Sequence, residues 1–364
     1  ERALDNLVFN LGLVEMLSYW KSTCSPEILI RCGFLDKKRV SWWQDLIKKG
    51  LGQYFFENKI DFRRSNLVKI TSADAKISSY QKSTIVEKRY QLKKRFLVPL
   101  GGGKDSIVTL EILKKAYPST SLRMTLGETG RVNCFSLNLN EAVTKVMKIA
   151  GCLKPIVVRR QIDPKLLELN RQGFLNSHTP FSAYLAFLSV LCAVIFDYKY
   201  IAFSNERSAN EGNVKYLGKM INHQYSKSFE FEQKFRQYCR KYLVRGVEYF
   251  SFLRPLYELQ IAKLFSRYSK YFQSFLSCNK AFKGRSGTKK LTGKWCGRCP
   301  KCLSVFLYLY PFLGEQMVSR IFGQYLLKKK ESWPIIQQLI GERGFKPFEC
   351  VGTIAESRAA LTGR

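Results

Sequence analysis

Three consecutive glycines separate two segments of different hydrophobic periodicity. Residues 96–100 read FLVPL, which is typical of a short buried strand, and residues 107–116 have the apolar spacing of a helix. Glycine lets the backbone approach a ligand closely, and the free N–H groups at the start of a helix attract anions. The intervening GGGKDS, residues 101–106, therefore predicts a phosphate-binding loop between a strand and a helix.

The alternation of strands and helices continues along the chain. We expect further strands at 134–137, 155–158 and 200–203, and helices at 141–150 and 181–196. This order predicts an α/β fold with a parallel sheet and helices on both faces, in which ligands bind beyond the carboxyl ends of the strands. We expect three regions: an N-terminal domain with a linker over 1–90, the α/β domain over 91–265, and a helical, cysteine-rich region over 266–364.

The residues that follow the glycines carry both signs of charge. Lys104 adds a positive charge to the loop, and Ser106 either caps the helix or donates to a phosphate. A phosphate would repel the carboxylate of Asp105, which therefore either caps the helix or lies near a bound Mg²⁺. A Walker A loop is excluded because Val98 stands where it needs glycine, and the dinucleotide fingerprint is excluded because Ser106 replaces its third glycine.

The segment 295–302 reads WCGRCPKC and places three cysteines at three-residue spacing. The thiolates of Cys296, Cys299 and Cys302 would converge around a tight turn, with Cys278 as the fourth ligand. Four thiolates suit a structural Zn²⁺, whereas an iron–sulfur cluster, which uses the same residue type, stays an alternative. Three nearby cations would offset the charge of the thiolates: Lys294, Arg298 and Lys301.

Composition limits the classes of protein to which the chain can belong. The 61 Lys+Arg against 28 Asp+Glu give a formal net charge of +33, which favours anionic partners. The basic residues are spread along the chain, so a solvated surface explains them as well, and a nucleic-acid partner is not required. The hydrophobic fraction of 46% excludes disorder for most of the chain. The apolar run 181–196 is shorter than the roughly 20 residues that cross a bilayer.

Eleven cysteines, an odd number without a signal peptide, argue against a framework of disulfides. They favour a reducing compartment, and we expect a cytoplasmic protein. The sequence does not define the oligomeric state.

Polar residues gather in further segments, although each residue also suits a purely structural role. The run 204–211 follows the strand predicted at 200–203, and 222–228 reads NHQYSKS. His178, beside Pro180, suits a capping role as well as a catalytic one. The remaining candidates in these runs and at the next helix start are Asn205, Glu206, Arg207, His223, Lys227 and Arg254.

GGGKDS resembles the PP-loop of the ATP pyrophosphatases, whose usual pattern is SGGxDS; Gly101 stands in place of the serine. The resemblance implies cleavage of ATP between its α- and β-phosphates, with an adenylated substrate and diphosphate as products. It also implies that the loop holds the phosphates through Gly101, Gly102, Gly103, Lys104, Asp105 and Ser106. Ser136 and Asn138, in the segment FSLN, match the place where this family binds adenine.

Over residues 90 to 352 the chain is similar to one branch of this family, the UDP-N-acetylmuramoyl-L-alanyl-L-glutamate epimerases of peptidoglycan synthesis. The matching segments are LVPLGGGKDS, FSLN, SNERSA, NHQYSKSFEFE, EYFSFLRPLYELQIA, SCNKAF, WCGRCPKC and PFECVG. The resemblance implies ATP- and Mg²⁺-dependent inversion of the terminal L-glutamate of UDP-MurNAc-L-Ala-L-Glu through an acyl-adenylate, with release of AMP and diphosphate.

This resemblance also assigns expected roles. Asn205, Glu206 and Arg207 would face the nucleotide or the acyl group, and Arg254 would bind phosphate or carboxylate. The candidates for proton transfer, which the sequence does not rank, are His223, Lys227 and Cys350.

Two other kinds of function fit parts of the sequence. The cysteine pattern is also similar to that of 7-cyano-7-deazaguanine synthase, and the charge suits a PP-loop ligase or thiolase that modifies tRNA. A basic, zinc-containing nucleic-acid-binding module is the non-enzymatic alternative, and it would leave ATP intact.

Overall fold

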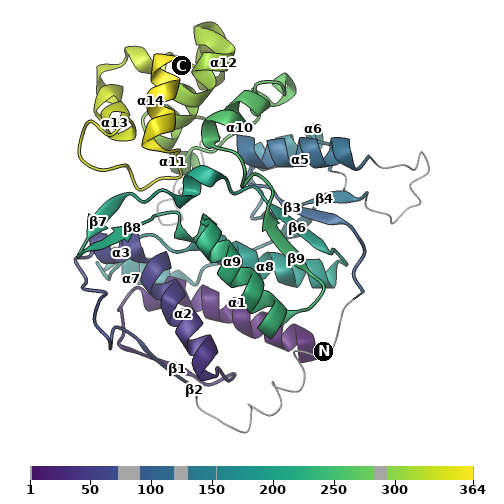
Figure 1. The fold of residues 1–364 in the computed structure, drawn as a ribbon, viewed down its shortest axis with the longest axis vertical. Coiled ribbons are helices and arrows are strands. Elements are labelled where there is room, and N and C mark those ends of the chain that lie inside the picture. Colours follow the sequence, from purple (N-terminus) through teal and green to yellow (C-terminus); the bar gives the residue numbers. More distant parts are fainter. Residues whose placement is uncertain (1, 73–90, 119–129, 153, 283–292, 364) are drawn as a thin grey trace. The chain divides into compact units, whose positions relative to one another are not determined.

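The computed structural model describes residues 2–72, 91–118, 130–152, 154–282 and 293–363 (Figure 1). Most of the predicted linker lies outside them. The chain divides into two compact units. The helical unit comprises Glu1–Lys93, Gln161–Lys199 and Gly212–Tyr249, and the sheet unit comprises Lys94–Arg160, Tyr200–Glu211 and Phe250–Arg364. The division into three domains predicted above stays a prediction.

A five-stranded sheet has the order β5-β4-β3-β6-β9. Its strands are β3 (Phe96–Pro99), β4 (Val132–Leu137), β5 (Ile156–Val158), β6 (Tyr200–Phe203) and β9 (Glu248–Ser251). β3 pairs in parallel with β4 and β6, and β4 pairs in parallel with β5. The predicted α/β class and its first four strands are confirmed. β9 was not predicted, because four residues within a mainly helical pattern give too short a period-2 signal.

The sheet unit contains seven α-helices in its described part. They are α5 (Lys104–Ala116), α6 (Glu141–Ile149), α10 (Glu258–Phe265), α11 (Asn279–Phe282), α12 (Pro300–Phe322), α13 (Trp333–Leu339) and α14 (Ile354–Thr362). The helix α5, which packs on β3, β4 and β6 (Figure 1), begins at Lys104 and not at Ile107 as predicted. The first turn was missed because its polar residues carry no apolar periodicity.

One hydrophobic core joins the sheet to the helices near the C-terminus. The same cluster of buried residues contains Val98 of β3, Leu110 of α5, Ile261 of α10 and Phe306 of α12. All four side chains are fully buried. The cysteine-rich segment therefore belongs to the same core as the helix that follows the glycines.

The described part of the helical unit contains six α-helices: α1 (Arg2–Trp20), α2 (Lys37–Gly50), α3 (Gly52–Glu57), α7 (Pro164–Arg171), α8 (Phe181–Ile195) and α9 (Phe229–Tyr238). The 3-10 turn η2 (Tyr225–Lys227) precedes α9, and the π-helical turn η3 (Cys239–Leu243) follows it. Two small sheets complete the unit: β1 (Glu27–Ile30) with β2 (Lys69–Ser72), and β7 (Val214–Tyr216) with β8 (Lys219–Ile221). The apolar run 181–196 forms the predicted buried helix, and Phe187 stacks on Trp43.

Cysteines outside the predicted cluster behave in two ways. Cys134 of β4 and Cys152 after α6 form a disulfide. The odd cysteine count gave no sign of this pair, because only the folded chain brings β4 and the end of α6 together. Cys192 and Cys239 are buried, free thiols of the helical unit.

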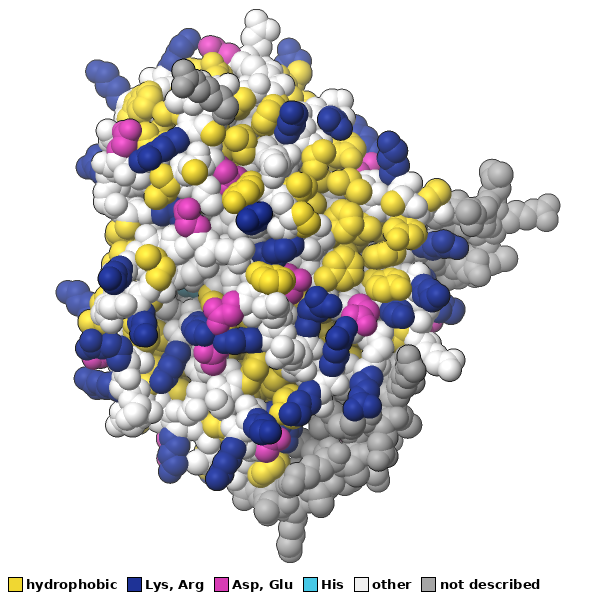
Figure 2. All heavy atoms as spheres, viewed as in Figure 1, with side chains coloured by type: hydrophobic (Ala, Val, Ile, Leu, Met, Phe, Trp, Pro, Cys, Tyr) yellow, Lys and Arg dark blue, Asp and Glu magenta, His cyan; other side chains and the backbone are white. Residues whose placement is uncertain are grey.

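The basic side chains form no single patch on the face drawn in Figure 2. Lysine and arginine are scattered over this face among fewer acidic side chains. On this face the distribution suits a solvated surface better than one extended nucleic-acid track. Among the described residues, we find no helix with the length and apolar character that a membrane span requires.

Candidate functional site

The glycine loop follows β3 and is held closely by two neighbouring segments. Gly102 has a φ of 82°, a conformation that favours glycine, and its carbonyl accepts a hydrogen bond from the Leu276 N–H at 2.9 Å. A Cβ added to Gly102 would lie 3.3 Å from Cγ2 of Val143, and one added to Gly103 would lie 3.2 Å from Cβ of Ser277. The glycines therefore allow the loop to pass between α6 and the segment that leads to Cys278.

A buried cluster of charges begins in the first turn of α5. Lys104, only 1% exposed, binds the carboxylates of both Asp105 and Glu258. Burial alone would lower the pKa of Lys104, but the two carboxylates outweigh it and raise that pKa above its ordinary value. The ammonium at the predicted phosphate site is therefore charged at neutral pH.

Lys301 belongs to the same cluster. Its Nζ lies 3.4 Å from Oε1 of Glu258 and donates to the carbonyl oxygen of Cys350. Burial opposes its charge, but the carboxylates of Glu258 and Asp105 dominate and raise the pKa of Lys301. We had expected Lys301 to offset the thiolates; the structure shows it bound instead to Glu258 and to the segment around Cys350.

The place of Glu258 in this cluster was not predicted from the sequence. It is the first residue of α10 and only 1% exposed. An acidic residue at the start of a helix normally serves the helix dipole, so its type and position gave no sign of two lysine partners. Its one earlier signal was its place in EYFSFLRPLYELQIA, a segment already matched to a family.

Residues beyond β6 and β9 are joined at the carboxyl edge of the sheet. Asn205 Nδ2 donates to Ser251 Oγ at 3.1 Å. Arg254 Nη1 donates to the carbonyl of Glu206 at 2.7 Å, and its Nη2 donates to Ser251 Oγ at 3.2 Å. The guanidinium of Arg207 lies over the ring of Tyr257, 5.2 Å from its centre. Four predicted site residues thus lie on adjoining loops, where parallel sheets place ligands.

The ends of β4 and β5 are linked through Asn138, which has a φ of 52°. Its Nδ2 donates to the carbonyl of Arg160 at 2.9 Å, and its Oδ1 accepts from the N–H of Arg160 at 2.8 Å. Ser136, in the same segment, is buried. In this structure the amide of Asn138 joins two strand ends, and its assignment to adenine stays a prediction.

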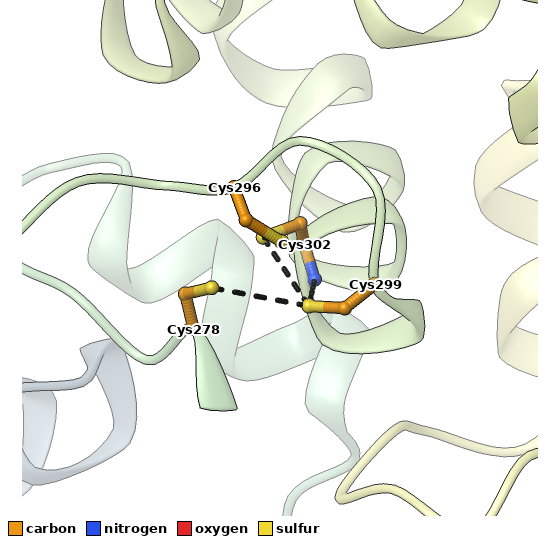
Figure 3. A group of neighbouring side chains, drawn as sticks. All are labelled: Cys278, Cys296, Cys299 and Cys302. Atoms are coloured by element: carbon orange, nitrogen blue, oxygen red, sulfur yellow. Dashed lines mark hydrogen bonds between the residues drawn. The ribbon is translucent and has the colours of Figure 1, made fainter. Parts of the chain in front are cut away.

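The four predicted cysteines of the cluster point toward one another (Figure 3). Their sulfur atoms all lie within 4.8 Å, with Sγ–Sγ distances of 3.4 Å for Cys299 to Cys302, 3.7 Å for Cys296 to Cys302, and 3.9 Å for Cys278 to Cys299. Zn–S bonds of about 2.3 Å in a tetrahedron would separate the sulfurs by about 3.8 Å. The donor set and its spacing therefore fit a four-coordinate metal.

The thiols of the cluster perturb one another. Hydrogen bonds from Cys299 and Cys302 lower the pKa of the Cys278 thiol, whereas the hydrogen bonds with Cys278 and burial raise the pKa of Cys299 and of Cys302. Cys299 caps α12, because its Sγ accepts the N–H of Cys302 at 3.4 Å. The turn that brings the cysteines together is thus also the start of a long helix of the core.

We expect the purified protein to contain about one zinc per chain, bound by these four cysteines. Cys299→Ala should lose the metal and lower the unfolding midpoint by about 10 °C, since a structural metal adds its binding energy to folding. Metal analysis and thermal unfolding measure both effects, with Cys192→Ala, which removes a buried thiol elsewhere, as the control. Iron with labile sulfide would contradict the assignment of zinc, and a metal-free protein would contradict the prediction of a metal site.

Two proton-transfer candidates lie in the helical unit. His223 Nδ1 lies 2.5 Å from Oε1 of Gln53, and its ring centre lies 4.2 Å from that of His178. The sequence did not predict that the two histidines lie together, because they are 45 positions apart. Lys227 ends η2, a few residues further on. The third candidate, Cys350, lies in the sheet unit with the glycine loop.

Comparisons with known proteins agree over most of the chain. Residues 1–252 match the family described as the MurL N-terminal domain, and residues 274–363 match the MurL C-terminal domain. A Micromonospora protein named UDP-N-acetyl-alpha-D-muramoyl-L-alanyl-L-glutamate epimerase is 35% identical over 97% of this chain and 73% of its own. Its namesake in Xanthomonas oryzae pv. oryzae is 32% identical over 96% of this chain and 72% of its own.

Proposed function

The chain belongs to the MurL family of UDP-N-acetyl-α-D-muramoyl-L-alanyl-L-glutamate epimerases, and we propose that it inverts the terminal glutamate of UDP-MurNAc-L-Ala-L-Glu at the expense of ATP. The identity of 35% over 97% of the chain carries the epimerase assignment. The glycine loop with its buried lysine supports the role of ATP, since both features serve to bind phosphate groups.

The proposed chemistry explains why an epimerase would consume ATP. The α-proton of a terminal glutamate is a very weak acid while the adjacent carboxylate is ionised, because its removal would create a second negative charge. Transfer of AMP from ATP to that carboxylate, with loss of diphosphate, gives a mixed anhydride whose acyl group carries no charge, so its enolate forms far more easily. A base removes the proton, an acid returns one to the opposite face, and water releases AMP and the D-glutamyl product.

The loop residues have distinct proposed roles in the first step. The N–H groups of the glycines and the ammonium of Lys104 would bind the phosphates, and Asp105 would bind the accompanying Mg²⁺. The side chain of Asp105 is 26% exposed, so one carboxylate of the cluster stays accessible to a cation. Asn205, Glu206 and Arg207 would face the nucleotide or the acyl group.

Inversion needs two proton-transfer groups on opposite sides of the carbon. Cys350 is supported as one of them because its backbone is held by Lys301, within the charge cluster of the loop. His223 and Lys227 stay the other candidates.

Deuterium incorporation separates an epimerase from a ligase that shares the same loop. In D₂O with ATP, Mg²⁺ and UDP-MurNAc-L-Ala-L-Glu, the glutamate of the product should carry deuterium at its α-carbon and have the D configuration. Without ATP it should carry none. Mass spectrometry and chiral analysis of the hydrolysed product measure both. Diphosphate release without deuterium in the product would indicate a ligase. Deuterium exchange without ATP would show that the reaction does not need the acyl-adenylate.

A further inference from the structure

Glu258 holds together two lysines that are distant in the sequence. Its Oε2 binds Lys104, in the first turn after the glycine loop, and its Oε1 lies 3.4 Å from Nζ of Lys301, in the cysteine turn. The three side chains are almost completely buried, with 2% exposure for Lys104 and Glu258 and 8% for Lys301. Two ammonium groups therefore converge beside the glycine loop, together with the carboxylates of Glu258 and Asp105.

The cysteine turn determines where Lys301 lies. Lys301 stands between Cys299 and Cys302, and the hydrogen bond from the Cys302 N–H to Cys299 Sγ spans it. Both flanking residues belong to the cluster that fits a metal. A metal bound there would fix the backbone of Lys301, while Glu258 and the Cys350 carbonyl fix its side chain.

A contribution to stability does not by itself explain why these charged side chains are buried. Replacing a buried ion pair with well-packed apolar side chains of similar volume is often neutral or stabilising. Convergent cations beside a glycine loop and a helix start are, in contrast, what an anionic ligand requires.

We propose that Lys301 is a second phosphate-binding cation of the ATP site, that Glu258 positions it beside Lys104, and that the cysteine cluster anchors it. This proposal rests on the proposed role of ATP. It gives the cluster a function in nucleotide binding, through one side chain, in addition to its part in folding.

Binding of Mg²⁺–ATP to variants of Lys301 tests the proposal, by calorimetry in the absence of the dipeptide substrate. Lys301→Gln keeps a hydrogen-bond donor for Glu258 and for the Cys350 carbonyl but loses the charge, so the dissociation constant should rise at least tenfold. Lys301→Arg, which keeps the charge, should recover most of the affinity. The control is Lys280→Met, which removes an exposed lysine two residues after Cys278 and should change the affinity less than twofold. Metal content and unfolding midpoint should be the same in all the variants.

The outcomes distinguish this proposal from the proposed role of ATP on which it rests. If Lys301→Gln retains its metal and binds ATP as tightly as Lys280→Met, Lys301 is not a phosphate-binding cation. The proposed function is unaffected by that result. Should Lys301→Gln lose metal or unfold early, Lys301→Arg decides: a metal-loaded Arg variant that binds ATP no better than the Gln variant overturns the proposal. A wild-type protein that binds no ATP overturns both proposals.

Discussion

Lys104→Met is expected to abolish the substrate-dependent release of diphosphate, by a factor of about 10³ or more. Lys104 is the first residue after the glycines, and methionine fills most of its volume without replacing the charge. Glu258 keeps Lys301 as a partner in the variant, so the buried carboxylate is not left uncompensated. Diphosphate release at saturating ATP and dipeptide, with the unfolding midpoint as a check of the fold, measures the effect.

Lys115→Met provides the matched control, because Lys115 is an exposed lysine near the end of the same helix. Its activity should stay within a factor of about two of wild type, as for other surface substitutions. Undiminished diphosphate release by Lys104→Met in a folded protein would contradict the assignment of the loop to ATP. Asp105→Asn should also lose activity, and its loss should be partly restored by excess Mg²⁺.

A large loss of stability is also expected from Glu356→Ala. The carboxylate of Glu356 accepts hydrogen bonds from Ser208 Oγ at 2.6 Å, the Leu259 N–H at 2.8 Å and the Thr353 N–H at 2.9 Å. Alanine would leave these buried donors unsatisfied, at about 1–3 kcal/mol each. We expect the free energy of unfolding to fall by about 4 kcal/mol, measured by urea denaturation.

Glu356→Gln and Glu342→Ala refine this experiment. Glutamine keeps one acceptor oxygen and should lose about half as much stability. Glu342 is exposed, and its removal should change the free energy of unfolding by less than about 0.5 kcal/mol. An equal, small effect of Glu356→Ala and Glu342→Ala would show that these hydrogen bonds do not hold α14 to the rest of the sheet unit.

The sequence predicted the parts of the site that depend on local patterns. Strand, glycine loop and helix follow one another within about 20 residues, and the three-residue spacing of Cys296, Cys299 and Cys302 is itself the geometry of a turn. Both patterns can be recognised in the sequence without knowledge of the tertiary fold. Cys278 was predicted as the fourth member of the cluster from its residue type, and the structure places its sulfur beside that of Cys299.

The remaining contacts depend on side chains that only the folded chain brings together. Glu258 lies 154 positions from Lys104, and nothing in the pattern of either segment links them. Glu356 likewise lies 148 positions from Ser208, and its TIAE segment is explained locally by the capping box that Thr353 forms with it. Both glutamates have a local role at the start of a helix, and this role explains the sequence without any long-range contact.

The interleaving of the two units has a consequence for biosynthesis on the ribosome. The sheet unit is assembled from Lys94–Arg160, Tyr200–Glu211 and Phe250–Arg364, so it cannot close before nearly the whole chain has been translated. After Lys104 has been synthesised, 154 further residues must be added up to Glu258. This takes roughly 8–30 s at typical elongation rates of 5–20 residues per second. During this interval the apolar β3 and α5 of the nascent chain lack their final partners. We therefore expect incomplete chains, such as those released by a nonsense codon before Glu258, to bind chaperones or be degraded, with no partial nucleotide site.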